Sequence, residues 1–139
     1  MYGFGPHTGY VARPPAEHMS LANARVHVTA MLETKAAFER LDAIAAVPGI
    51  DALTIGPTDL AQDLGVLGTP SQKSALTEYR TRVAEAARKH KKAVAMLTDS
   101  VEGVREMIAL GATIINYSSD TAILRAGYAA LVEAVKTRK

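Results

Sequence analysis

Cysteine is absent from the chain, and its absence removes three kinds of chemistry at once. A protein without cysteine forms no disulfide, binds no metal through thiolates and has no cysteine nucleophile. The four histidines are not paired at HxxxH or similar spacing, so a zinc site has no support either.

The chain also lacks a strong charge of either sign and a long apolar run. It carries 16 basic and 14 acidic residues, a net charge of +2, which gives no case for steering toward nucleic acid. No apolar run approaches the roughly 20 residues of a membrane span, and no signal peptide is evident. We therefore expect a cytoplasmic protein with neither a nucleic-acid nor a membrane partner.

Four short apolar segments alternate with patterns of helical spacing. Apolar runs of this kind between helices are typical of a parallel sheet covered by helices, which is an α/β fold. We expect a single domain, in which residues 1–24 form a leading loop and linker and residues 25–139 form four βα units. The expected strands are 26–32, 52–55, 93–97 and 113–116, and the expected helices are 35–47, 71–90, 100–110 and one that starts near residue 119. We expect His27 to pack within the first strand and residues 60–70 to form a loop. In the helix over 100–110, the residues expected to face the core are Val101, Val104, Met107 and Ile108.

Two acids follow the first two expected strands. Glu33 ends the first strand, and Asp59 follows the second in the turn Gly56-Pro57-Thr58-Asp59. The carboxyl ends of parallel strands form the ligand-binding rim of α/β folds, so the two carboxylates are placed to converge. Two converging carboxylates repel unless one is protonated or a cation lies between them, and oxygen ligands suit Mg²⁺ or Mn²⁺. Two alternatives stay open: Glu33 in the first turn of its helix, and Asp59 as an N-cap.

Several short sequence motifs resemble those of a known family. MLET at 31–34, AIAAVPGIDAL at 43–53, IGPTDLAQDLG at 55–65, LGAT at 110–113 and SDTA at 119–122 resemble the HpcH/HpaI aldolase / citrate lyase family. They are most similar to its class II pyruvate aldolases, which act on 2-keto-3-deoxy sugar acids and 2,4-dihydroxyhept-2-enedioate. The resemblance covers nearly the whole chain from Gly3 onward.

This resemblance implies a (β/α)8 TIM barrel, of which the chain corresponds to the second half. It implies that Glu33 and Asp59 bind the divalent cation, which is Mg²⁺, Mn²⁺ or Co²⁺. It also implies that the turn Gly56-Pro57-Thr58-Asp59 binds the substrate, with the amides of Thr58 and Asp59 holding the carboxylate of pyruvate. Met31 departs from the family, because many members carry Gln two residues before the metal-binding Glu.

Length limits what the chain does alone, since a closed barrel needs roughly 200 residues or more and this chain has 139. The family's His base and substrate-binding Arg lie on early strands that are missing here. His7, in the loop that borders the family's active-site mouth, is the only candidate for the base. We expect the partner to be a second copy of the chain or the missing N-terminal half.

The expected function is retro-aldol cleavage of a 2-keto-3-deoxy or 4-hydroxy-2-oxo acid to pyruvate and an aldehyde. A Schiff-base mechanism is disfavoured, because every lysine lies in a helix or loop pattern. The last two strand ends lack the glycine-rich loop of a phosphate site. Two alternatives remain: a non-catalytic half-barrel that serves in binding or assembly, and a malyl- or citramalyl-CoA lyase.

Overall fold

Four parallel strands form one sheet at the centre of the chain. A computed structural model describes residues 5–136, except for the side chain of His7. The strands lie in the sheet in their order along the chain, and each pairs in parallel with the next. This arrangement confirms the expected α/β class. The strands are β1 (Thr29–Leu32), β2 (Ala52–Ile55), β3 (Ala93–Thr98) and β4 (Ile114–Tyr117).

Helices occupy the connections between the strands. Three helices begin at side-chain caps in the described part of the chain: Thr34 accepts a hydrogen bond from the Ala37 amide (3.1 Å), Ser100 from the Gly103 amide (3.0 Å) and Ser119 from the Ala122 amide (3.2 Å). The helical elements are η1 (Pro6–Thr8), α1 (Pro15–Arg25), α2 (Lys35–Glu39), α3 (Leu41–Ala45), α4 (Pro57–Asp63), α5 (Gln72–Lys89), α6 (Val101–Ala109) and α7 (Asp120–Lys136).

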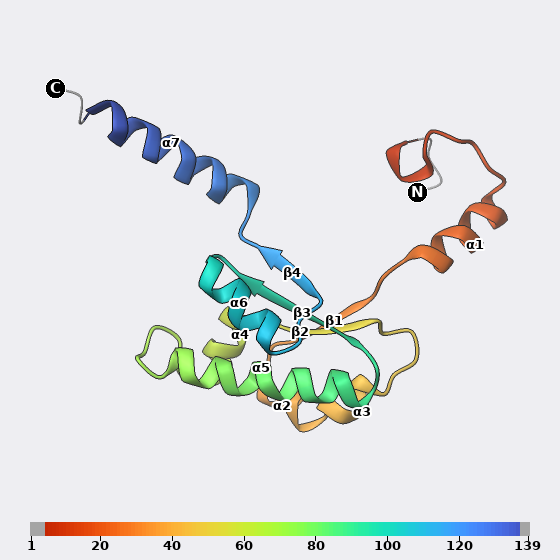
Figure 1. Cartoon of the computed structure of the whole chain (residues 1–139). Coiled ribbons are helices and arrows are strands. Elements are labelled where there is room, and N and C mark those ends of the chain that lie inside the picture. Colours follow the sequence, from red (N-terminus) through yellow and green to blue (C-terminus); the bar gives the residue numbers. More distant parts are fainter. Residues whose placement is uncertain (1–4, 137–139) are drawn as a thin grey trace.

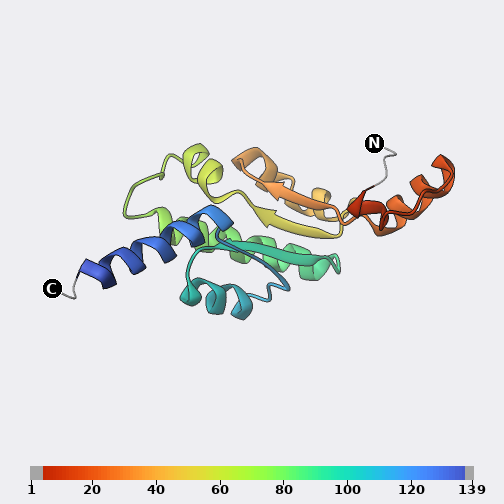
Figure 2. The same cartoon turned by 90° about the horizontal axis from the view of Figure 1, so that it is seen from above.

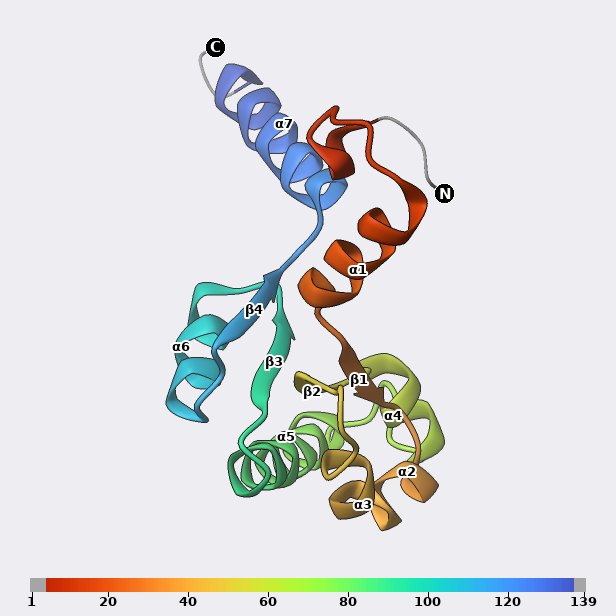
Figure 3. The same cartoon turned by 90° about the vertical axis from the view of Figure 1, so that its right-hand side faces the viewer.

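The hydrophobic core lies between one face of the sheet and the helices α2 to α6, which surround the outside of the curved sheet (Figure 3). Alternation along each strand sends every second side chain into this core. Arg82 of α5 lies over the rings of Phe38 and Tyr79, 5.1 and 4.9 Å from their centroids, and ties α2 to α5. The main core side chains from strands and helices are Leu32, Phe38, Leu53, Ile55, Leu60, Leu76, Val83, Val94, Met96 and Met107.

Charged side chains join the C-terminal end of α5 to α3. Asp42 accepts hydrogen bonds from Lys89 Nζ (2.6 Å) and His90 Nε2 (2.8 Å). The hydrogen bond from Lys89, followed by that from His90, holds the pKa of Asp42 below its ordinary value. These contacts are solvent-exposed, so they fix orientation more than they stabilise the fold.

The first strand is shorter and more exposed than the sequence predicts. We expected a buried strand over 26–32 with His27 packed inside it, but β1 begins at Thr29 and His27 is exposed. β1 is an edge strand, and only Leu32 among its residues is buried. The apolar run predicted burial on both faces, whereas here helices cover only one of them.

The structure differs from the predicted helix over 35–47 and from the predicted turn and loop over 56–70. The expected helix over 35–47 is two short helices, because the Arg40 amide bonds to Ala37 O (3.1 Å) and breaks the regular ladder. The expected turn at 56–59 and loop at 60–70 contain instead α4, which starts at Pro57. Proline is well suited to a first helical position, since its missing N–H has no helical partner there.

The face of α6 was also predicted incorrectly in part. Met107 is buried as expected, but Val101 and Ile108 are 53% and 58% exposed. α6 contacts β3 and β4 at the β4 edge of the sheet. Gly103 is buried on α6, and a Cβ there would collide with Thr98 Oγ1 and lie 3.0 Å from Ser100 Oγ.

The terminal helices α1 and α7 extend away from the sheet in both views (Figures 1 and 2). None of their described side chains is buried. An apolar stripe on α7, formed by Leu124, Tyr128, Leu131 and Val135, is 59 to 67% exposed. No helix in residues 5–136 has the length and apolar character needed to cross a membrane.

We propose that the chain associates through these uncovered surfaces, because an apolar stripe exposed to water is costly. Light scattering over a concentration series should give a mass above that of one 14.7 kDa chain. Leu131→Asp should reduce the mass, whereas Ala126→Asp, on the other side of α7, should leave it unchanged. A stable monomer at all concentrations would argue against association.

Candidate active site

The parallel register of β1 and β2 brings Glu33 and Gly56 together. Leu32 lies opposite Ile55, so the next residues of the two strands, Glu33 and Gly56, are neighbours at the C-terminal end of the sheet. The Gly56 amide donates to Leu32 O (3.1 Å) and fixes this pairing. The rim predicted from the sequence is thus where the sheet places it.

The side chain of Glu33 lies directly over the α-carbon of Gly56. A Cβ at position 56 would collide with Glu33 Oε1 and lie 2.6 and 2.9 Å from Glu33 Cγ and Cδ. The contact involves the stem of Glu33 as well as its tip, so a larger residue at 56 would displace the whole side chain. Gly56 has an ordinary φ of −89°, and the glycine is therefore needed for space and not for its backbone conformation.

Asp59 lies in the first turn of α4. Gly56 is the N-cap, and Pro57, Thr58 and Asp59 are the first three helical residues. Asp59 is thus not an N-cap, which removes that alternative. Glu33 is not in a first helical turn either, because Thr34 caps α2 and Glu33 precedes it. Neither alternative holds: Glu33 is not in the first turn of a helix, and Asp59 is not an N-cap.

The start of α4 presents backbone amides that no helical carbonyl accepts. Leu60 N–H bonds to Gly56 O (2.9 Å) and closes the first turn. The amides of the three preceding helical positions have no partner in the helix, and Pro57 has no N–H. Thr58 and Asp59 thus carry the unpaired amides at this end of the helix.

A hydrogen bond that sequence reasoning missed joins the two rim segments. Asp63, the last residue of α4, accepts the backbone N–H of Lys35 at the start of α2 (2.7 Å). It holds the helix that follows β2 against the helix that follows β1. No local pattern could have revealed the pairing, because the two residues are 28 positions apart.

The donor chemistry fits a hard divalent cation. Among residues 5–136, the carboxylates of Glu33 and Asp59 make no hydrogen bond or ion pair with another group, and Glu33 is half-buried. The described residues contain no cluster of three or more His, Asp or Glu side chains that could hold a metal. Two carboxylates suffice for Mg²⁺, which keeps several waters and takes further oxygen ligands from a substrate.

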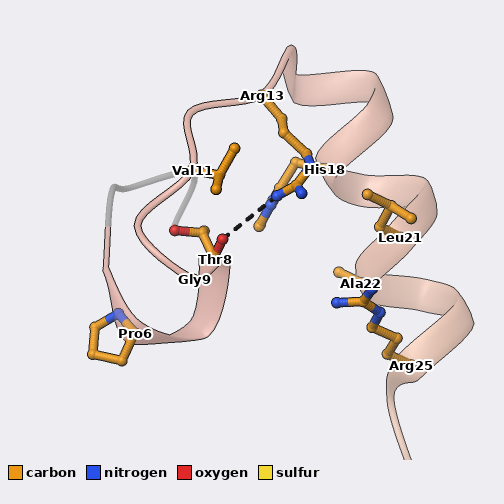
Figure 4. Close-up of a pocket in the computed structure, with 9 residues that line it drawn as sticks. All are labelled: Pro6, Thr8, Gly9, Val11, Arg13, His18, Leu21, Ala22 and Arg25. Atoms are coloured by element: carbon orange, nitrogen blue, oxygen red, sulfur yellow. Dashed lines mark hydrogen bonds between the residues drawn. The ribbon is translucent and has the colours of Figure 1, made fainter.

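The N-terminal segment lies away from this rim. α1 leads into the N-terminal end of β1, whereas Glu33 follows its C-terminal end. Arg13 lies beside a cavity of about 490 Å³ between η1 and α1, where its guanidinium donates to Thr8 O at 3.4 Å (Figure 4). The same guanidinium lies 3.4 Å from Glu17 Oε1. The side chain of His7, the candidate base, lies outside the described part of the chain.

Comparison with known proteins gives consistent matches. The profile of the HpcH/HpaI aldolase/citrate lyase family matches residues 8–126. The 5-keto-4-deoxy-D-glucarate aldolase of Klebsiella pneumoniae is 27% identical over 94% of this chain and 50% of that protein. The crystal structure of an HpcH/HpaI aldolase from Desulfitobacterium hafniense has a TM-score of 0.79 and 28% identity, covering 93% of this chain and 50% of that one.

A third match carries a different activity. The citrate synthase SbnG is 25% identical, with a TM-score of 0.73, over 92% of this chain and 52% of that one. The chain spans about half the length of the curated relatives it matches. Aldolase and citrate synthase share this architecture, so the architecture alone does not select one reaction.

The contact between Glu33 and Gly56 can be tested by a double-mutant cycle. Gly56→Ala should lower the free energy of unfolding by about 1–3 kcal/mol, because the new methyl group must displace Glu33. Glu33→Ala in the same background should restore part of this loss, with a coupling of about 0.5–3 kcal/mol. Urea denaturation measures both.

Gly127→Ala is the matched control, since a Cβ there meets no atom within 4 Å. It should not lower stability. Additive effects of Gly56→Ala and Glu33→Ala would show that the two residues are not in contact.

Proposed function

Because the chain belongs to the HpcH/HpaI aldolase/citrate lyase family, we propose that it serves metal-dependent cleavage of a 4-hydroxy-2-oxo or 2-keto-3-deoxy acid to pyruvate and an aldehyde. The observation that carries the proposal is the position of Glu33 over Gly56, beside the start of α4. The Klebsiella relative, by its name, acts on 5-keto-4-deoxy-D-glucarate, which is a substrate of this chemical class.

Glu33 and Asp59 are the residues that would hold the cation, which we propose to be Mg²⁺, Mn²⁺ or Co²⁺. Their oxygen atoms are the ligand type that such ions prefer. A bound divalent cation supplies a Lewis acid that polarises the keto oxygen of the substrate. Gly56 leaves the space in which the Glu33 carboxylate lies, and the bond between Asp63 and Lys35 holds the two segments together.

The amides of Thr58 and Asp59 would bind the carboxylate of the pyruvate portion. Both lie at the start of a helix, where unpaired N–H groups and the helix dipole favour an anion. Pro57 contributes no donor but sets the backbone for the first turn. Because Thr58 is exposed and acts through its amide, its side chain is not required for this contact.

The cleavage itself needs a base at the C4 hydroxyl of the substrate. The base takes the hydroxyl proton, the C3–C4 bond breaks as the aldehyde carbonyl forms, and the electron pair of that bond becomes the enolate of pyruvate. A proton added at C3 then gives pyruvate. The segment that carries His7 lies away from the rim, so the base, like the further βα units that complete the pocket, would come from another copy or chain.

A second function follows if no base reaches the substrate. The chain would then be a non-catalytic half-barrel that keeps the cation and 2-oxo acid site and serves in binding or assembly. Binding of pyruvate without turnover separates this function from the enzyme. The CoA-lyase alternative requires a surface that recognises CoA, which a CoA-binding titration would detect.

Loss of either acid should abolish metal-dependent pyruvate binding. Glu33→Gln and Asp59→Asn keep the shape of each side chain but remove the charge that a divalent cation requires. Calorimetric titration with pyruvate in the presence of Mn²⁺ measures the effect, and circular dichroism should show an unchanged fold. Glu39→Gln, an exposed acid on α2, is the control and should bind normally. Unchanged binding in both Glu33→Gln and Asp59→Asn would refute the site.

Two substitutions at Thr58 should separate its backbone from its side chain. Thr58→Ala keeps the amide and should change the pyruvate dissociation constant less than about threefold. Thr58→Pro removes the donor and restricts Pro57, so it should weaken binding at least about tenfold. The same titration measures both variants, and equal effects would argue against a role for the amide.

A further inference from the structure

The cavity between η1 and α1 has a positively charged lining. Its volume of about 490 Å³ lies in the range of pockets that hold small molecules. Two arginines and a histidine line it, and no acidic residue does so in the described part of the chain. The lining residues that matter for its chemistry are Thr8, Val11, Arg13, His18, Leu21 and Arg25.

One face of α1 forms a wall of this cavity. His18, Leu21, Ala22 and Arg25 are spaced three, four and seven positions apart, which places them on the same side of the helix. Helical side chains lean toward the N-terminus of their helix, so Arg25 reaches back over the preceding turn. Figure 4 shows its guanidinium beside Ala22. The charge of Arg25 therefore lies next to an apolar surface.

The opposite wall is a turn closed by its own hydrogen bonds. The Gly5 amide donates to Thr8 Oγ1 (3.2 Å), and the same hydroxyl donates to Gly5 O (2.8 Å). The Tyr10 amide also donates to Gly5 O (3.0 Å). Gly9 and Tyr10 have φ values of 62° and 58°, and these two left-handed residues turn the chain toward α1. The hydrogen bond from Arg13 to Thr8 O then joins the turn to the start of the helix.

The two arginines differ in how far the protein satisfies them. Arg13 lies 3.4 Å from both Thr8 O and Glu17 Oε1, which is long compared with the roughly 2.7–2.9 Å of a charge-assisted hydrogen bond. Among residues 5–136, the Arg25 guanidinium makes no hydrogen bond or ion pair. Arg25 thus has all five of its N–H groups available, and Arg13 has contacts that a stronger acceptor can replace.

We propose that this cavity binds an organic phosphate, with the phosphate group held by Arg13 and Arg25 beside the ring of His18. A phosphate group has nearly two negative charges at neutral pH and three strong acceptor oxygens, so it can satisfy two guanidinium groups together. The apolar side chains of Val11 and Leu21 would contact the organic part of the ligand. The site uses neither the cation nor the amides of Thr58 and Asp59, and it is therefore independent of the proposed function.

Calorimetric titration of the full chain with phenyl phosphate and with benzenesulfonate tests this assignment. The two probes have similar shapes, but phenyl phosphate carries nearly two negative charges at neutral pH and benzenesulfonate carries a single one. Wild-type protein should bind phenyl phosphate at least about fivefold more tightly than benzenesulfonate. Arg25→Gln should weaken the binding of phenyl phosphate at least about tenfold, because it removes the guanidinium that has no other partner.

Glu17→Gln should act in the opposite direction. It releases Arg13 from a competing carboxylate and should strengthen the binding of phenyl phosphate about twofold, which loss of a merely structural contact would not do. Arg105→Gln is the matched control, since it removes an exposed arginine from α6, whose ion pair with Glu102 spans 3.9 Å. This variant should bind as the wild type does.

Two further measurements locate the ligand. The NMR signal of Arg25 Nε–H should shift when phenyl phosphate is added, and Thr58→Pro, which alters the start of α4, should keep phenyl phosphate binding. Circular dichroism checks that each variant is folded. If Arg25→Gln does not fold, Arg25→Lys, which keeps the charge without the planar fork and should retain part of the binding, decides the matter together with Glu17→Gln.

Three results would overturn the phosphate site. The first is equal affinity for phenyl phosphate and benzenesulfonate, and the second is unchanged binding in a folded Arg25→Gln variant. The third is loss of phenyl phosphate binding in Thr58→Pro, which would place the anion at α4.

Discussion

The parallel pairing of β1 with β2 is the constraint on which the candidate site depends. It sets Leu32 opposite Ile55, and the next step along both strands brings the Glu33 side chain onto the bare α-carbon of Gly56. A shift of the register by one residue would turn Glu33 to the other face of the sheet. The same shift would remove Leu32 and Ile55 from the core. The packing that stabilises the sheet therefore also fixes the position of Glu33.

The start of α4 depends on this pairing in turn. The chain leaves β2 at Gly56 and enters the helix at once, which puts Thr58 and Asp59 within one helical turn of the Glu33 contact. Burial of Leu60 and Ala61 holds the helix to the core, and the bond from Lys35 to Asp63 holds its far end. Substrate contacts through backbone amides need such a firmly placed helix, because an amide cannot be repositioned by a side-chain rotation.

Sequence patterns predicted the sheet and the places of Glu33 and Asp59 well, since apolar strands and the acids that end them are local features. The same reasoning failed where tertiary contacts decide the outcome. Arg40 interrupts an otherwise good helical pattern, and the Gly-Pro step was interpreted as a turn although it begins a helix. His27 precedes the edge strand β1, and Ile108 lies on α6 beside the last strand, so both are exposed. Apolar spacing does not reveal which element becomes an edge.

Crystal diffraction from protein loaded with Mn²⁺ and oxalate, collected near the manganese absorption edge, tests most directly whether Glu33 and Asp59 form one cation site. Oxalate resembles the carboxylate and keto oxygens of pyruvate but cannot be cleaved. We expect a single strong anomalous peak at this rim, about 2.1 Å from an oxygen of each carboxylate, with the oxalate directed toward the amides of Thr58 and Asp59. A peak that contacts only one of the two acids, or a peak elsewhere on the molecule, would contradict the proposed site.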